Sequence, residues 1–194
     1  MSRQRLFVEI ALVLGLSLGM SALYSLVGIA VRVGRDEPLS EQTATLNRSA
    51  STVEWADFAY QILGIAQSLV PVALVLFLLY RASRPRFGAL GLDATKPVRD
   101  GVQGFGLAAL IGIPGLGVYF VGRELDLTVS VVPTALGTYW WTIPMLLLLA
   151  LRAGLVEEII AVGYLFARLR ELAVPLWAII VLQALLRGTY HLYQ

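Results

Sequence analysis

The chain has 194 residues, of which 58% are hydrophobic and 14% are charged, and its mean hydropathy is +0.76. Soluble domains carry about 25% charged residues, so this composition argues against a soluble protein and indicates one that crosses a membrane repeatedly. The chain has no cysteine, which excludes disulfides and thiolate metal sites, and a net charge of +2 gives no sign of nucleic-acid binding.

Long uncharged runs recur along the chain, and each could cross about 30 Å of hydrocarbon as a helix. The first, residues 10–31, is too long for the apolar core of a signal peptide and has no cleavage signal after it, so we expect it to stay in the membrane. The later runs are residues 58–80, 101–122, about 144–167 and about 175–194. The sequence therefore predicts an all-α, polytopic helical membrane protein with about five transmembrane helices, in a single transmembrane domain over residues 1–194.

The charges between these runs predict the orientation of the chain. The net basic segments are the N-terminus with Arg3 and Arg5, residues 81–100 and residues 168–171, and the net acidic segments are residues 32–57 and 123–126. Since basic loops stay in the cytosol, we expect a multi-pass protein of the cell (plasma) membrane with a cytosolic N-terminus. Residues 129–141 contain two tryptophans, and we expect them to approach the fourth run along the interface or as a re-entrant segment.

Two adjacent acids, Glu157 and Glu158, interrupt the fourth run in the stretch GLVEEIIAVGYLFARLRE. A carboxylate at the bilayer centre costs about 2.5–3.5 kcal/mol on insertion scales, so two acids are not expected to face lipid. One interpretation ends the helix near Gly154 and leaves both acids at an aqueous edge. The other continues the helix to Arg168 and places Glu157 about 16 Å deep at helical rise. We favour the second, because nine apolar residues follow Glu158.

Helical spacing distinguishes the two acids. The residues three, four and seven positions from Glu157 are mostly small, and they allow another helix to pack closely. The neighbours of Glu158 are bulkier, so Glu157 is expected to face the protein interior. Tyr164 lies on the same stripe as Glu157 and is expected to support the site.

Arg187 and His191 stand four residues apart in the last run, and so share one helical face. The short turn before that run predicts that the fourth and fifth helices are antiparallel neighbours, which brings Arg187 close to the depth of Glu157. A lone histidine is ordinarily a satisfied core or interfacial side chain, but its convergence with an arginine and two acids favours a functional cluster. A desolvated Glu can act as a general base on water, and a histidine can stabilise an oxyanion.

These residues resemble the CPBP family, the CAAX-protease and bacteriocin-processing intramembrane peptidases. The family's first motif, Glu-Glu-x-x-x-Arg followed by Gly-Tyr-Leu, resembles EEIIAVGYL, and its second motif, Phe-x-x-x-His, resembles RGTYH. The resemblance covers about residues 144–194. Val162 stands where the first motif has Arg, and Arg187 stands where the second has Phe. Our hypothesis is that the guanidinium has moved to the neighbouring helix and still pairs with the two acids.

The resemblance implies an intramembrane endopeptidase of the CAAX-protease type that hydrolyses a peptide bond near the cytosolic membrane face. Glu157, Glu158 and His191 would be catalytic, and Arg187 and Tyr164 would support them. The cofactor is left open between none and one divalent metal, such as zinc, bound by Glu157 and His191. The expected partners are membrane lipids and a peptide or protein substrate, not nucleic acid.

The family's third motif, a further histidine followed by Asn or Asp, is absent from this chain, which ends three residues after His191. We therefore expect either a C-terminally truncated sequence or a protein that has lost this part of the site. An alternative function is a non-catalytic membrane protein of the same fold, for bacteriocin immunity or as a scaffold, in which the cluster locks helices together. A transporter would also use buried acids, but the sequence shows no inverted repeat.

Overall fold

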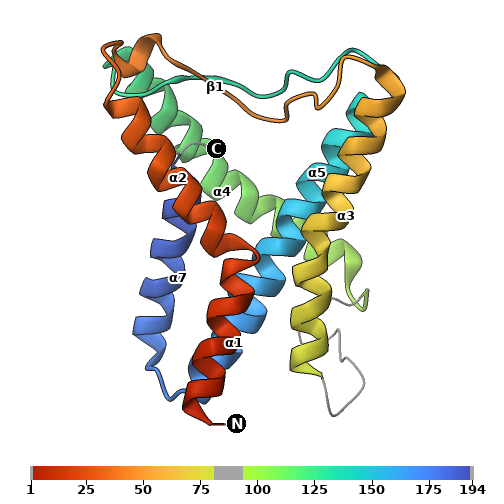
Figure 1. The fold of residues 1–194 in the computed structure, drawn as a ribbon, viewed down its shortest axis with the longest axis vertical. Helices are drawn as coiled ribbons and strands as arrows, with labels where there is room; N and C mark the ends of the chain where they lie inside the picture. Colours follow the sequence, from red (N-terminus) through yellow and green to blue (C-terminus); the bar gives the residue numbers. More distant parts are fainter. Residues whose placement is uncertain (1, 81–93, 193–194) are drawn as a thin grey trace.

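The computed structural model describes residues 2–80 and 94–192, and their fold is almost entirely helical (Figure 1). In chain order the elements are α1 (Arg3–Gly15), α2 (Leu18–Val33), the 3₁₀ turn η1 (Leu39–Glu41), β1 (Thr43–Thr45), α3 (Glu54–Leu79), α4 (Pro97–Glu124), β2 (Ser130–Val132), α5 (Thr142–Val156), the π-helix η3 (Glu157–Leu165), α6 (Phe166–Glu171) and α7 (Leu176–Tyr190). The predicted all-α class is confirmed.

The helices also fit a membrane protein. Within the described residues, α3 and α4 are long and apolar enough to cross a bilayer, and α1 with α2 makes a third span if the bent pair counts as one. α5, η3 and α6 follow one another without a break over residues 142–171, where the sequence predicts the fourth span. α7 is apolar but has only 15 residues. The number of five spans therefore stays a prediction.

The first predicted span, residues 10–31, falls on a bent pair of helices that can still count as one span. The helix begins at Arg3 and breaks after Gly15, and α1 and α2 meet at 56°. At the break, the Ser17 hydroxyl donates to the Val13 carbonyl at 2.6 Å, a bond to the preceding turn that bends helices. A Cβ at Gly19 would lie 2.7 Å from the Leu14 carbonyl oxygen, so this close approach requires glycine. The hydropathy of the sequence gives no sign of this bend.

The loops after α2 and after α4 meet at one end of the molecule, at the top of Figure 1. There β1 and β2 pair in parallel, with Thr43 opposite Ser130. Asp57, in the first turn of α3, is buried and accepts a hydrogen bond of 2.7 Å from the Ser49 hydroxyl. Residues 129–141, expected to approach the fourth span along the interface, form β2 and the turn into α5.

The loops divide between the two ends of the molecule as the charge pattern predicts. The N-terminus and the turn between α6 and α7 lie at the end opposite to the β1–β2 pair (Figure 1). Most of the basic segment of residues 81–100 falls on residues 81–93, which lie outside the described residues. The alternation of the loops agrees with the predicted topology, whereas the assignment of one end to the cytosol stays a prediction.

The π-helix η3 lies at the centre of the core. Ile160, Ala161 and Tyr164 are fully buried and belong to one apolar cluster with residues of α1, α2, α3 and α7. A π-helix has i→i+5 hydrogen bonds and a wider turn than an α-helix, and such segments often occur at functional sites. This one covers the EEIIAVGYL motif.

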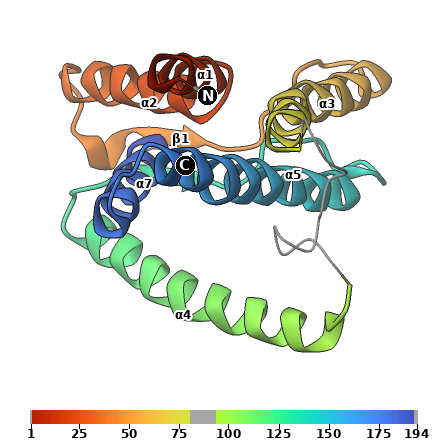
Figure 2. The same cartoon turned by 90° about the horizontal axis from the view of Figure 1, so that it is seen from below.

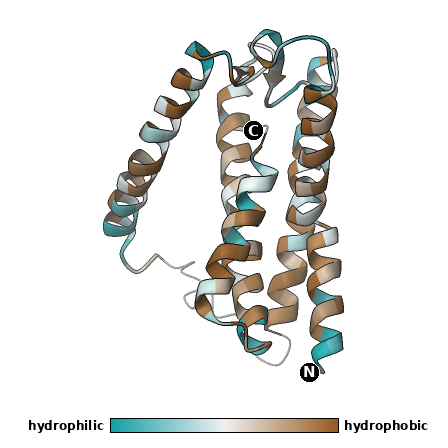
Figure 3. Ribbon diagram, turned by 90° about the vertical axis from the view of Figure 1, so that its left-hand side faces the viewer, coloured by the Kyte–Doolittle hydropathy of each residue, from teal (hydrophilic) through white to brown (hydrophobic). Residues whose placement is uncertain are grey.

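α4 stands apart from the other helices (Figures 2 and 3). None of its residues is buried. Its C-terminal end is attached to the loops, because the Arg123 guanidinium donates to the carbonyls of Ser40 and Thr128 at 2.8 Å. The Tyr119 hydroxyl also accepts a hydrogen bond from the Val131 amide. Figure 3 shows that apolar residues predominate along this helix, as expected of a helix that faces lipid.

Candidate active site

The start of η3 and the end of α7 together form a polar cluster. One nitrogen of Arg187, Nη2, donates to Glu157 Oε2 at 3.0 Å and to Glu158 Oε1 at 2.8 Å, so a single guanidinium bridges both acids. His191 lies at the C-cap of α7, and its Nε2 is 3.5 Å from Glu157 Oε1. We call these four residues the Glu157 cluster. The structure thus brings together four of the five predicted site residues, and the predicted pairing of Arg187 with both acids is present.

The helix that carries Arg187 reaches the cluster in a way that differs from the prediction. α7 packs chiefly against α2, where the Ser25 hydroxyl donates to the Tyr190 carbonyl at 3.2 Å, and not against the preceding helix. The prediction that the fourth and fifth helices are close neighbours is wrong in this respect. Long side chains span the gap instead, since Gln183 donates to the Ala161 carbonyl at 2.7 Å and Arg187 reaches the acids.

The two acids differ in exposure. The Glu157 side chain is 18% exposed and the Glu158 side chain 59%, so Glu157 is the acid that faces the protein. Arg187 and His191 are 40% and 45% exposed. The cluster is therefore accessible on one side and is not enclosed within the core.

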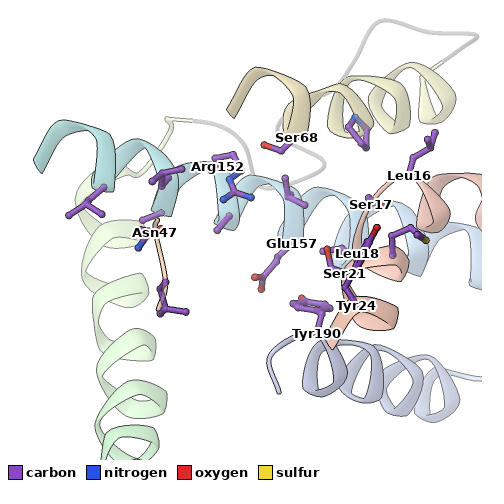
Figure 4. A pocket seen from close by; sticks show the side chains of 18 of the residues that line it. Leu16, Ser17, Leu18, Ser21, Tyr24, Asn47, Ser68, Arg152, Glu157 and Tyr190 are labelled. Carbon is purple, nitrogen blue, oxygen red and sulfur yellow. The ribbon is translucent and has the colours of Figure 1, made fainter. Parts of the chain in front are cut away.

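A cavity of about 760 Å³ adjoins the cluster (Figure 4). It is lined by residues of α2, α3, α5 and the loop that follows β1, together with Glu157 and Tyr190. Figure 4 shows the side chains of Glu157 and Tyr190 next to each other at this cavity. The Tyr190 hydroxyl is buried and has no hydrogen-bond partner among the described residues. The sequence analysis missed Tyr190, although it stands three residues after Arg187 and so shares its helical face.

The structure places Tyr164 away from the Glu157 cluster. Its hydroxyl donates to Glu9 Oε1 at 3.1 Å, and its ring centroid is 5.6 Å from the guanidinium carbon of Arg168. The prediction that it lies on the same stripe as Glu157 assumed 3.6 residues per turn. In the wider turn of the π-helix, residues seven positions apart no longer share a face.

Tyr164 belongs to a second polar cluster, which the sequence analysis did not predict. Arg168 donates from Nε to Glu9 at 2.8 Å, from Nη1 to Glu171 at 2.6 Å and from Nη2 to the Leu78 carbonyl at 3.0 Å. The side chains of Arg168 and Glu9 are 8% and 12% exposed. We call these residues, with Tyr164, the Arg168 cluster. It joins α1 and the end of α3 to α6, and Glu9, the acid directly before the first apolar run, was the available signal.

The residues predicted to bind a metal do not form a complete site. Catalytic zinc in proteins takes three protein ligands. Glu157 and His191 supply two, and no group of three His, Cys, Asp or Glu side chains in residues 2–80 and 94–192 is placed to hold an ion. The described residues therefore do not fit a three-ligand zinc site.

Comparison with known proteins shows that this region is similar to one protein family. Residues 139–194 match the family model described as type II CAAX prenyl endopeptidase Rce1-like. Comparison with curated proteins and with solved structures gave no match. The matched segment runs from the turn before α5 through the Glu157 cluster, and it agrees with the family resemblance of the two sequence motifs. Residues 139–194 of the chain are therefore similar to the Rce1-like, type II CAAX prenyl endopeptidase family.

Proposed function

We propose that this protein is an intramembrane endopeptidase of the CAAX-protease type, in which Glu157 activates a water molecule to hydrolyse a peptide bond. The observation that carries the proposal is a half-enclosed carboxylate at the edge of a cavity, held by Arg187 through one oxygen and facing His191 with the other. The family match of residues 139–194 independently supports a protease or family-related function.

In this mechanism Glu157 Oε1 takes the proton. Because Arg187 binds Oε2, the carboxylate is held in one orientation and Oε1 can accept a hydrogen bond from water. The water oxygen attacks the carbonyl carbon as its proton passes to Glu157. Glu157 then gives this proton to the leaving nitrogen as the C–N bond breaks, which yields a carboxylic acid and an amine.

The remaining residues of the cluster position and stabilise these groups. His191 Nε2 lies next to Glu157 Oε1, and as a hydrogen-bond donor it can stabilise the oxyanion of the tetrahedral intermediate. Glu158 is more exposed, and its contact with Arg187 holds the guanidinium between the two acids. Glu158 is therefore proposed as a positioning residue.

We also propose that the protein lies in the plasma membrane with its N-terminus in the cytosol, and that its partners are membrane lipids and a peptide or protein substrate. Arg3 and Arg5 belong to the start of α1 and Arg170 to α6, and the N-terminus and the turn after α6 lie at the same end of the molecule (Figure 1), as the positive-inside rule expects. The cavity extends from Glu157 toward the loop after β1, at the opposite end. With the N-terminus in the cytosol, the cavity would therefore extend toward the non-cytosolic side, whereas the family resemblance implies cleavage near the cytosolic face.

The test is Glu157→Gln, measured on the full chain in lipid vesicles with a panel of prenylated and unprenylated reporter peptides. We expect cleavage to fall by about 10²–10⁴-fold, because the general base is lost. The melting midpoint should stay close to that of the unaltered protein. Glu124→Gln is a matched control, since Glu124 is an exposed acid outside the cluster. Undiminished cleavage by Glu157→Gln would exclude Glu157 as the base.

One observation favours a second candidate function, a non-catalytic membrane protein. Arg187 is shared by both acids and joins α7 to η3, as a structural ion pair would. In that case no reporter is cleaved by the unaltered protein, and Glu157→Gln lowers the melting midpoint. The same experiment thus separates the two functions.

A further inference from the structure

Arg152 is a charged residue within α5 that the proposed mechanism does not use. It lies about 16 Å from Trp141 and about 24 Å from Arg168 at helical rise, and these two residues are close to the ends of the continuous helical run. Its side chain is therefore far from both ends of a membrane-crossing helix. An ionisable residue at such a depth is functional by default, because its insertion is costly.

Among the described residues, the guanidinium of Arg152 lacks the acid partners that Arg168 and Arg187 have. Its Nε atom is buried and has no hydrogen-bond partner in the part of the chain that the structure describes. Arg168 and Arg187 each bind two acids, whereas none of the ion pairs among the described residues includes Arg152. Arg152 is only partly buried as a whole, and a charged group with a buried, unsatisfied nitrogen is expected to bind an anion from outside the protein.

Arg152 and Glu157 line the same cavity (Figure 4). The side chains of Ser68 and Asn47 add polar groups to its lining. Arg152 and Glu157 are five positions apart in the sequence, which corresponds to about 7 Å along the helix axis. An extended peptide advances about 3.3 Å per residue, so one peptide can contact both groups. An anionic group at Arg152 would then lie within a few residues of the bond next to Glu157.

We propose that Arg152 binds a carboxylate of the peptide that occupies this cavity, and so selects substrates by charge and sets their position relative to Glu157. This inference rests on the proposed function, because it takes the molecule in the cavity to be a peptide. Arginine and carboxylate form two parallel charge-assisted hydrogen bonds, and Nε is one of the donors that can take part. A lipid phosphate lies at headgroup level, so the depth of Arg152 favours a peptide carboxylate. The carboxylate is either the C-terminal one or an acidic side chain.

Binding of a small set of peptides to the full chain in detergent tests this proposal without any cleavage. The probes are an N-acetylated apolar hexapeptide as the free acid, the same peptide as the C-terminal amide, and the amide with one glutamate side chain. We expect one of the two acidic peptides to bind at least tenfold more tightly than the neutral amide, and the tighter one identifies the source of the carboxylate. Arg152→Gln should abolish this preference. Arg170→Gln should keep it, since Arg170 is exposed and outside the cavity.

Equal binding of all three peptides, or an equal loss of all three in Arg152→Gln, would overturn the proposal. Competition by a short-chain phosphatidic acid, with no preference among the peptides, would assign the site to lipid and also overturn it. A preference for acidic peptides without any cleavage would support the carboxylate site and count against the protease. Cleavage without a preference for acidic peptides would support the protease and count against the carboxylate site.

Thermal melting of Arg152→Leu adds a readout that does not depend on finding a ligand. If Arg152 is kept for binding, removal of its unpaired charge should raise the melting midpoint of the peptide-free protein. If Arg152 has a structural role, the midpoint should fall, and this result would overturn the proposal.

Discussion

The Arg168 cluster and the Glu157 cluster lie on the same continuous helical run, but only the first is closed. In the Arg168 cluster each of the three guanidinium nitrogens has its own acceptor, and both Arg168 and Glu9 are nearly buried. In the Glu157 cluster one nitrogen of Arg187 serves two acids. There the side chains of Glu158, Arg187 and His191 are all at least 40% exposed.

This difference in exposure and bonding suggests a structural role for the Arg168 cluster and a chemical role for the Glu157 cluster, although both contain the same types of charged residue. In the Arg168 cluster every guanidinium nitrogen is already bound, although Glu171 is 45% exposed, and the cluster contributes by joining helices. The Glu157 cluster adjoins a cavity, and Glu157 Oε1 is not bound by Arg187. We therefore expect substitutions in the Arg168 cluster to change stability and substitutions in the Glu157 cluster to change activity.

The largest effect on stability is expected from Glu9→Ala. This change leaves Arg168 buried without its closest acid partner from α1, which costs about 3–5 kcal/mol for a buried ion pair. The free energy of unfolding in detergent measures it. Glu124→Ala, at an exposed acid, should change this quantity by less than about 0.5 kcal/mol. If Glu9→Ala is as stable as the unaltered protein, the Arg168 cluster is not a structural clamp.

His191→Ala should reduce activity by about 10²–10³-fold, because a donor to the oxyanion is lost. Its effect on stability should be small, since the side chain is 45% exposed at the end of a helix. Reporter cleavage and thermal melting are measured on the same preparation. Leu192→Ala is the control, because this neighbour is exposed to the same extent. A lower melting midpoint with unchanged cleavage would make His191 a structural residue.

Gly19→Ala tests whether the bend between α1 and α2 needs a glycine at position 19. A Cβ at Gly19 would meet a backbone atom, the Leu14 carbonyl oxygen, at 2.7 Å, so we expect a loss of about 1–3 kcal/mol in unfolding free energy. Gly15→Ala is the matched control, because a Cβ there meets nothing within 4 Å. Equal stability of the two variants would show that the bend does not need a glycine at position 19.

The smallest effect is expected for the contact between Arg187 and Glu158, whose side chains are 40% and 59% exposed. A double-mutant cycle with Arg187→Ala and Glu158→Ala should give a coupling of about 0.5–1 kcal/mol in the free energy of unfolding. Fully additive losses would mean that the two side chains do not pair.

The sequence was sufficient to predict the helical membrane fold and the contacts of Arg187 and His191 with Glu157. Hydropathy runs and charges within them are local signals, and the chain has few charges among which to choose. It did not predict the bend at Ser17, because no proline marks it and a side chain bonded to the backbone produces it. It misplaced Tyr164 because the π-helix changes the number of residues per turn, and tertiary packing decides whether such a turn forms.

The sequence also did not predict how α7 packs. The short turn after α6 predicts that α7 packs directly against the helix before it. The main partner of α7 is instead α2, which is far away along the chain. The unpaired Arg152 could be read as a charge within an apolar run, but only the structure shows that it lines the cavity beside Glu157. Patterns of single residues in a sequence do not show which distant segments of the chain contact each other.

The most direct test of the contrast between the two clusters compares Glu157→Gln with Glu9→Gln in the same vesicles. Reporter cleavage is expressed per folded molecule, and melting is measured in parallel. We predict that Glu157→Gln loses cleavage with an unchanged melting midpoint, and that Glu9→Gln melts earlier but keeps its cleavage per folded molecule. The reverse pattern, with cleavage retained by Glu157→Gln and its melting midpoint lowered, would contradict the account.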